Sequence, residues 1–385
     1  MSTMVKILAT ADWQMDMAGG SLNASERDYL SEARLETIEK ILELAKEEDV
    51  DVILAAGDLF EYPRPTPEVI DAVAKVLQRW KEIPIYAIPG NHDLYGSSSV
   101  WNTPVFRNIK HFHLHHEQTQ TEIAEGFTLH SIPVKSRYDI QPQDELLEDV
   151  SDEDGVHIVM AHGHDLAAGT FGTHEDGIKL PIDSAKVMKK GYSLLILGHW
   201  HSWNEVQKNR VLYPGTHEQT KFSESDAGYV AIIDVIEGES EPQITKKRVG
   251  KIKWANEDFD CTGKELTNDL VEYVRQQKEN GIEFLKLKLI GEVDVGSLAG
   301  AIPDAIAVCR TLVRHLDISF EELTTTIDVE AMTNSIVLPM GLREIQNSIL
   351  SELKNAKGNK EITNNLLDEL TALYRSCRSA GILGD

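Results

Sequence analysis

The sequence predicts an α/β protein: a layered α/β sandwich of two mixed sheets with flanking helices, followed by a small α/β domain and C-terminal helices. Three observations lead to this prediction. Residues 5–89 alternate strand, helix, strand, helix and strand, which favours a parallel sheet with covering helices. Beyond Trp101 short apolar runs follow one another more closely, which indicates a second sheet packed on the first. Polar residues directly follow several of these runs, as at the functional edge of a sheet.

The first sheet is expected to contain three strands covered by two helices. Leu35, Ile38 and Leu42 recur at helical spacing, so they share one apolar face of the first helix. Thr66 suits the N-cap of the second helix, and Pro67 suits its first position. The expected elements are a strand over 5–9, a helix over 31–48, a strand over 52–56, a helix over 66–80 and a strand over 84–89.

The second sheet is expected to consist of shorter strands separated by loops. Residues 141–154 are acidic, which indicates a solvated loop. Each expected strand is a short apolar run bounded by turn residues. The expected strands cover residues 127–132, 156–160, 194–197, 210–213, 228–235 and 244–249.

Two breaks in the pattern divide the chain. The first lies near residues 251–261, and the second lies near 324–335. Between them the pattern helix 264–279, strand 284–290, helix 296–308 and strand 311–316 predicts a small α/β domain. Beyond them two amphipathic helices are expected, over 342–355 and 361–377. The expected domains therefore cover residues 1–255, 256–330 and 331–385.

The composition indicates a soluble protein of a reducing compartment. The 385 residues suffice for two or three domains, and no apolar run is long enough to span a membrane. Cys261, Cys309 and Cys377 are odd in number and far apart, which argues against a disulfide framework and favours the cytoplasm. The net charge of −25 argues against a protein that coats nucleic acid, but bound cations could still attract DNA to an enzyme.

Five short polar segments each follow an apolar run. The central one is residues 90–93, Gly-Asn-His-Asp, which pack poorly at the end of a buried strand unless they approach a ligand or metal. Carboxylate and amide oxygens suit hard divalent cations, and borderline metals also accept imidazole. His199 and His201 are two residues apart, which in an extended chain puts both on one side. The candidate ligands of a paired metal site are Asp12, Asp58, Asn91, His162, His199 and His201.

These segments resemble the motifs of the calcineurin-like metallophosphoesterase family, which are Asp-x-His, Gly-Asp, Gly-Asn-His-(Asp/Glu), a His after a strand, and Gly-His-x-His. The order and spacing match over residues 4 to about 235. Residues 57–60, Gly-Asp-Leu-Phe, and 213–216, Tyr-Pro-Gly-Thr, are further similar to segments of SbcD-type DNA repair exonucleases. The resemblance implies the metallophosphoesterase fold and a metal-dependent DNA exo/endonuclease acting in double-strand-break repair.

The resemblance also implies how the metals are held. Two Mn²⁺ ions, with Mg²⁺ as an alternative, would hold the water that attacks the phosphorus in line. His92 would contact the scissile phosphate and help the leaving oxygen depart. Asp58 would bridge the two ions. One metal would take Asp12, Asp58 and His201, and the other would take Asp58, Asn91, His162 and His199.

The sequence departs from the family pattern at two positions. Gln14 stands where the family has the histidine of Asp-x-His, and its neutral amide oxygen is a weaker metal ligand than an imidazole. Glu61 stands where relatives carry Asp or His, and its carboxylate could hold His92 oriented and protonated. We therefore expect one tight metal site and one that fills only at higher metal concentration.

Nucleases of this type carry a capping domain after the catalytic domain and end in helices that dock on an ABC-type ATPase, SbcC in the bacterial complex. The same layout here implies DNA as substrate, an SbcC-like ATPase as partner, a homodimer of the nuclease, and no membrane. Amphipathic helices commonly dock through one apolar stripe. The tail offers two such stripes, Leu342, Ile345, Ile349 and Leu353 in one and Leu366, Leu367, Leu370 and Leu373 in the other.

Other interpretations stay open. The ligand-like residues could be satisfied polar groups at strand ends, and the tail helices could belong to the core. A phosphodiesterase or phosphatase for a small nucleotide or a phosphoprotein would have no need of the domains after residue 255. A degenerate scaffold for the ATPase, indicated by Gln14, need not hold two ions. The histidines of residues 111–116 resemble a metal tract, but they fit better a strand with Phe112 and Leu114 inward.

Overall fold

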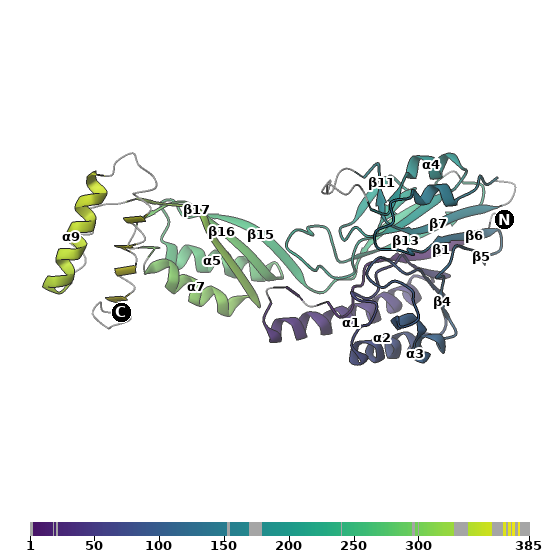
Figure 1. Cartoon of the computed structure of the whole chain (residues 1–385), viewed down its shortest axis with the longest axis horizontal. Helices are drawn as coiled ribbons and strands as arrows, with labels where there is room; N and C mark the ends of the chain where they lie inside the picture. The colour runs from purple at the N-terminus through teal and green to yellow at the C-terminus, as the bar shows by residue number, and fades with distance from the viewer. Residues whose placement is uncertain are drawn as a thin grey trace. The chain divides into compact units, whose positions relative to one another are not determined.

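The protein divides into two compact units, Met1–Lys253 and Trp254–Asp385 (Figure 1). The expected division of the second unit into a capping domain and a helical tail stays a prediction. In the computed structural model, the described residues are 3–17, 19–20, 22–151, 155–168, 179–239, 241–294, 297–298, 300–326, 338–355, 365–366, 369–370, 372–373 and 376–377.

The first unit is built on two six-stranded mixed sheets, which confirms the predicted layered sandwich. In each sheet four parallel strands occupy consecutive positions, and antiparallel strands complete the order. Across the first sheet the strands are β14 (Gln243–Arg248), β13 (Tyr229–Ile236), β1 (Met4–Thr10), β2 (Val52–Ala55), β3 (Ile85–Ala87) and β4 (Phe112–Leu114). Across the second they are β11 (Asn204–Gln207), β12 (Val211–Tyr213), β10 (Leu194–Gly198), β7 (Val156–His162), β6 (Phe127–Ile132) and β5 (Thr119–Ala124).

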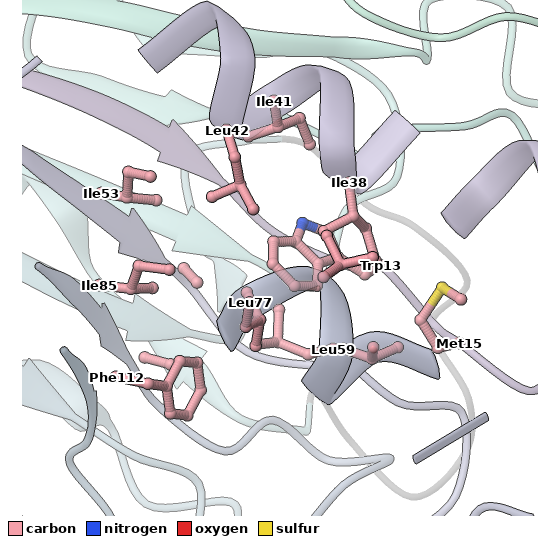
Figure 2. Packing of buried hydrophobic residues seen from close by; sticks show 14 of the residues in the cluster. Trp13, Met15, Ile38, Ile41, Leu42, Ile53, Leu59, Leu77, Ile85 and Phe112 are labelled. Atoms are coloured by element: carbon pink, nitrogen blue, oxygen red, sulfur yellow. The ribbon is translucent and has the colours of Figure 1, made fainter. Parts of the chain in front are cut away.

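Alternate residues of the central strands face different layers. Leu8 and Ile53 pack against helices on the outer face of the first sheet, in the cluster shown in Figure 2. Ile7 and Leu54, one position away, pack instead between the two sheets. These strands are therefore apolar on both faces, as is usual for parallel strands covered on two sides. The helices of this unit are α1 (Ala24–Glu47), α2 (Pro67–Arg79), α3 (Pro104–Arg107) and α4 (Ser184–Lys189), with 3₁₀ helices η1 (Val100–Asn102) and η2 (Gln143–Leu146) and the short pair β8 (His164–Asp165) and β9 (Pro181–Ile182).

Two local expectations for the first unit are wrong. Helix α1 begins at Ala24 rather than at residue 31, because Asn23 and Glu26 form a capping box, with hydrogen bonds of 3.0 and 2.8 Å between each side chain and the other residue's backbone N–H. The acidic segment 141–154 is not simply a solvated loop. Gln143 lies buried in η2, and its side-chain amide donates to the carbonyl of His162 over 2.9 Å.

The second unit contains a three-stranded sheet with two helices packed on it. The two units divide after Lys253, within the break expected at residues 251–261. Most of that segment forms the edge strand β15, which apolar periodicity missed because Phe259 is its only fully buried residue. The helix expected over 296–308 is α7, which covers Ala301–Leu312. The strand expected over 311–316 is β17, which is longer and covers His315–Thr326. The elements are β15 (Lys253–Asp260), α5 (Leu266–Glu279), β16 (Ile282–Asp294), α7 (Ala301–Leu312), β17 (His315–Thr326) and α9 (Met340–Asn355).

The apolar stripe expected on α9 is divided between two environments. Ile349 and Leu353 are buried within the chain, whereas Ile345 is 49% exposed and Met340 is 84% exposed. Of the helix expected over 361–377, the described residues are helical, and Leu367 lies outside the described residues. No helix in the described part of the chain is long and apolar enough to cross a membrane.

Candidate metal centre

The candidate ligands lie at the carboxyl ends of parallel strands in both sheets. In the first sheet Asp12 follows β1, Asp58 follows β2, and Asn91 follows β3. In the second sheet His162 is the last residue of β7, and His199 directly follows β10. Because each sheet is parallel at these strands, their polar ends gather at one edge of the sandwich.

Four of the predicted ligands converge on one point. Asp58, His162 and His199 bring potential ligand atoms within 4.8 Å of one another. Asn91 Oδ1 lies 3.0 Å from His162 Nε2 and 2.9 Å from His199 Nδ1. Asp58 Oδ2 lies 3.2 Å from His162 Nε2. The structure thus brings together the four residues that were assigned to one metal.

Asp12 and His201, which were assigned with Asp58 to the other metal, do not belong to this group of mutually close ligand atoms. Asp12 is buried, and both its carboxylate oxygens accept from the backbone N–H of His199 over 3.0 Å. Burial raises the pKa of Asp12 to about 6, although the charges of His162 and His201 act in the opposite direction. Gln14 is also buried, and its backbone N–H donates to the carbonyl of Asp58 over 2.9 Å.

The backbone at the site is turned into the left-handed region at four predicted ligands. Non-glycine residues rarely adopt positive φ, and such strain gathers at functional sites. The inference that His199 and His201 sit side by side on extended chain is wrong, because the chain turns sharply at His199. The four φ angles are 51° at Asp12, 40° at Gln14, 52° at Asp58 and 100° at His199.

Three motif glycines leave room for His162 and Asp58. A Cβ on Gly198 would lie 1.9 Å from the carbonyl oxygen of Ala56 and 2.6 Å from His162 Nδ1. A Cβ on Gly57 would lie 2.5 Å from the same nitrogen, and one on Gly90 would lie 2.2 Å from Asp58 Oδ1. These distances are too short for any side chain, so the ligands can occupy their positions only beside glycine.

Two histidines are oriented through the ring nitrogen Nδ1. His162 Nδ1 donates to the carbonyl of Ala56 over 2.8 Å, which directs Nε2 to the ligand group. His201 Nδ1 lies 2.6 Å from Glu224 Oε1. Glu224 in turn accepts from the backbone N–H of Thr220 over 2.6 Å. Glu224 carries no signal in the sequence, because it lies in an irregular segment outside every motif.

His92 lies beside the ligand group, and its side chain is partly accessible. Its Nδ1 lies 3.2 Å from the carbonyl oxygen of Glu61 and 3.4 Å from Glu61 Oε1, and its side chain is 32% exposed. The hydrogen bond to Glu61 raises the pKa of His92 despite partial burial. The backbone N–H of His92 donates to Asp58 Oδ1 over 2.7 Å, so the ring stays close to the ligand group.

The last residue of the Gly-Asn-His-Asp segment has a structural role. Asp93 is fully buried, and its carboxylate accepts backbone N–H groups of Leu59 over 2.8 Å, Phe60 over 3.3 Å and Gly90 over 2.7 Å. It therefore joins the loop after β2 to the loop after β3, and these two loops carry Asp58 and Asn91.

The histidine tract of residues 111–116 is the edge strand β4 and the residues beside it. Phe112 is buried and His113 is exposed, as the alternating pattern predicts. His115 is half-buried, with Nδ1 2.8 Å from the hydroxyl of Ser131. Within the described ranges, Asp58, His162 and His199 form the only group of three His, Cys, Asp or Glu residues close enough to hold a metal ion together. The histidine tract forms no such group.

Comparison with known proteins identifies the family. Residues 5–203 match the model of the calcineurin-like phosphoesterases. The chain belongs to this family. Phosphoesterases of this family are metal-dependent hydrolases with a dimetal site.

Solved structures show remote similarity to this phosphoesterase. The protein TT1561 of Thermus thermophilus is 15% identical, with a TM-score of 0.40 over 64% of this chain and 100% of that chain. The purple acid phosphatase PPD1 from yellow lupin (Lupinus luteus) seeds is 13% identical, with a TM-score of 0.36 over 65% of this chain and 52% of that chain. A dimetal phosphatase from Danio rerio is 11% identical, with a TM-score of 0.39 over 62% of this chain and 98% of that chain.

The donor set of the phosphoesterase fits divalent cations. It combines carboxylates, an amide oxygen and imidazoles, which together suit Mn²⁺ or a similar ion. Burial disfavours the charged imidazole, but Asp58 outweighs it and raises the pKa of His162 to about 9. Burial and the charge of His162 lower the pKa of His199 to about 3.

Gly198→Ala should damage the centre while a control substitution does not. The added methyl group overlaps the Ala56 carbonyl and His162, so we expect the free energy of unfolding to fall by on the order of 3 kcal/mol and Mn²⁺ binding to weaken. Gly96→Ala is the control, because no atom lies within 4 Å of the added carbon. Urea denaturation and calorimetric titration of Mn²⁺ test both variants. Equal effects of the two substitutions would contradict the packing argument.

Metal binding at neutral pH should release a proton. The raised pKa of His162, about 9, keeps its ring charged at pH 7, and Nε2 must lose that proton before it can bind a cation. Apparent affinity should therefore rise by about tenfold per pH unit from pH 7 towards pH 9. Calorimetry in buffers of different ionisation enthalpy counts the protons released. Binding that is independent of pH across this range would show that His162 is neutral in the metal-free protein.

Proposed function

We propose that this phosphoesterase is a two-metal DNA exo/endonuclease of the SbcD type, which acts in double-strand-break repair with an ABC-type ATPase. The observation that carries the proposal is the second compact unit, residues 254–385, which a phosphatase for small substrates does not require. The segments at 57–60 and 213–216, similar to those of SbcD-type nucleases, support it. The proposal includes Mn²⁺ as the metal and a cytoplasmic homodimer.

The residues of the centre have distinct tasks in such a reaction. When bound, two cations stabilise charge on the phosphoryl group and acidify the attacking water. His92 would hold a phosphate oxygen and donate a proton to the leaving oxygen, and its hydrogen bond to Glu61 raises its pKa, which favours the protonated ring. Asn91 and Asp58 are held by the loops that Asp93 joins. The residues that would hold the cations are Asp12, Gln14, Asp58, Asn91, His162, His199 and His201.

Digestion of labelled linear DNA tests the proposal. We expect cleavage with Mn²⁺, slower cleavage with Mg²⁺ and none in EDTA. Asp58→Asn should abolish cleavage, because loss of this carboxylate removes the residue shared by both metal sets. Asp226→Asn is the control, since the side chain of Asp226 is 46% exposed and pairs with Lys246. Hydrolysis of a small phosphodiester without DNA cleavage would favour the small-substrate alternative, and fewer than two bound ions would favour the scaffold.

His92→Ala should slow turnover without loss of metal. His92 is assigned to the phosphate, so the rate should fall by on the order of 10²–10⁴, which is the range for a general acid. Metal content measured by mass spectrometry should stay at the level of the unaltered protein, because none of the ligand contacts around Asn91 Oδ1 involves this ring. Loss of bound metal would mean that His92 is a ligand.

The exposed side of α9 should bind the ATPase. Ile349 and Leu353 are buried within the chain, so the available apolar surface is that of Met340 and Ile345. The double variant Met340→Asp with Ile345→Asp should abolish association with a co-purified SbcC-like ATPase, as measured by size-exclusion chromatography. Asn347→Asp, also exposed on α9, is the matched control. Unchanged association of the double variant would contradict docking through this face.

A further inference from the structure

An exposed loop with basic and aromatic residues lies beside the metal centre. It follows β6 and spans residues 135–140, all of which are exposed except the half-buried Asp139. Tyr138 is 67% exposed. Single exposed aromatic residues are ordinary on protein surfaces, so the position of this one has to be explained by its contacts.

The start of the loop is fixed to the segment that carries Asn91. The backbone N–H of Val134 donates to the carbonyl of Pro89 over 3.2 Å. Three residues later, Arg137 Nε donates to the carbonyl oxygen of Asn91 over 3.0 Å. The loop is therefore bound to a predicted metal ligand, and Tyr138 is the residue directly after that contact.

The other side of the loop is held by the segment before β9. The backbone N–H of Leu180 donates to the carbonyl of Asp139 over 2.7 Å. This contact brings Lys179 over Tyr138, with Nζ 4.9 Å from the ring centroid. A cation over one face of an aromatic ring is attracted by its quadrupole. The Tyr138 ring is 67% exposed, so ring surface remains accessible for stacking.

The charge of this surface differs from that of the whole chain. Lys135, Arg137 and Lys179 are cations of one small region, whereas the net charge of the protein is −25. Cationic side chains beside an aromatic ring form the usual binding surface for unpaired nucleotides, since the cations contact phosphates and the ring stacks on a base. A phosphopeptide would use the cations, but it would not need the ring.

We propose that Tyr138, with Arg137 and Lys179, forms a subsite for the nucleobase next to the scissile phosphate. The base stacks on the open face of Tyr138, and the two cations contact phosphates of the same strand. The subsite rests on the proposed function, in which the substrate is a nucleotide phosphodiester. We therefore expect unpaired DNA, rather than fully duplex DNA, to bind at this edge of the sandwich.

Binding of single-stranded DNA to the full chain in EDTA tests the subsite without catalysis. The two probes are an oligothymidylate and an oligomer of equal length made of abasic sites, both labelled with fluorescein. Fluorescence anisotropy measures the affinity of the protein for each probe. Tyr138→Ala should weaken binding of oligothymidylate by roughly 5- to 100-fold, the range for loss of one base stack, and should not affect the abasic oligomer. Tyr138→Phe should bind as the unaltered protein does.

Two further variants separate stacking from charge and from general surface effects. Lys135→Gln removes a further exposed cation of the same loop and leaves the three residues of the subsite unchanged. It should weaken binding of both oligomers equally, because phosphates attract the cation with or without bases. Phe320→Ala removes another exposed aromatic residue, in the second unit, and should change neither affinity. Displacement of the probe by AMP would show that the subsite binds the base of a free nucleotide. If AMP does not displace the probe, the subsite binds a base only as part of a DNA strand.

Three results would overturn the subsite. These are equal affinity of Tyr138→Ala and the unaltered protein, equal weakening on the abasic oligomer, and no binding of oligothymidylate at all. A phosphopeptide ligand would give the first of them. The nuclease proposal is judged separately by Mn²⁺-dependent cleavage, so base-dependent binding without cleavage would contradict that proposal and retain the subsite.

Discussion

The contact between Asp58 and His162 is the interaction on which the metal centre depends. The two residues come from different sheets, and both side chains are almost completely buried. A buried pair of this kind is tolerated only when its remaining hydrogen-bonding atoms are satisfied. Asp58 accepts the backbone N–H of His92, and His162 donates to Ala56. The same bonds therefore join the sheets and orient the ligand atoms.

Charge explains how an acidic protein can act on an anionic substrate. The chain carries a net charge of −25, and without metal the carboxylates of the centre would repel a phosphate. Bound cations reverse this local field. The cations of the loop at 135–140 lie at the same edge, since Arg137 contacts the carbonyl of Asn91. Both sets of cations would therefore attract an anionic substrate to this edge of the sandwich.

Much of the fold and part of the site could be predicted because the signals are local. The short apolar runs of β1 and β2 are visible in any short window of sequence, and such runs are typical of strands buried on both faces. Asn91 and His162 each end an apolar run, and parallel strands place such ends at one edge. Where the local signal is weak, as in the mostly polar residues of β15, the sequence did not predict the strand.

The sequence by itself determined the layered sandwich, the strand ends that carry ligands, and the glycines beside them. Only the tertiary structure decided the turn at His199, the support of His201 by Glu224, and the contact of Arg137 with Asn91. The last two contacts join residues that are far apart along the chain and belong to irregular segments. No periodicity records such pairs, because they exist only once the sheets have packed and brought the loops together.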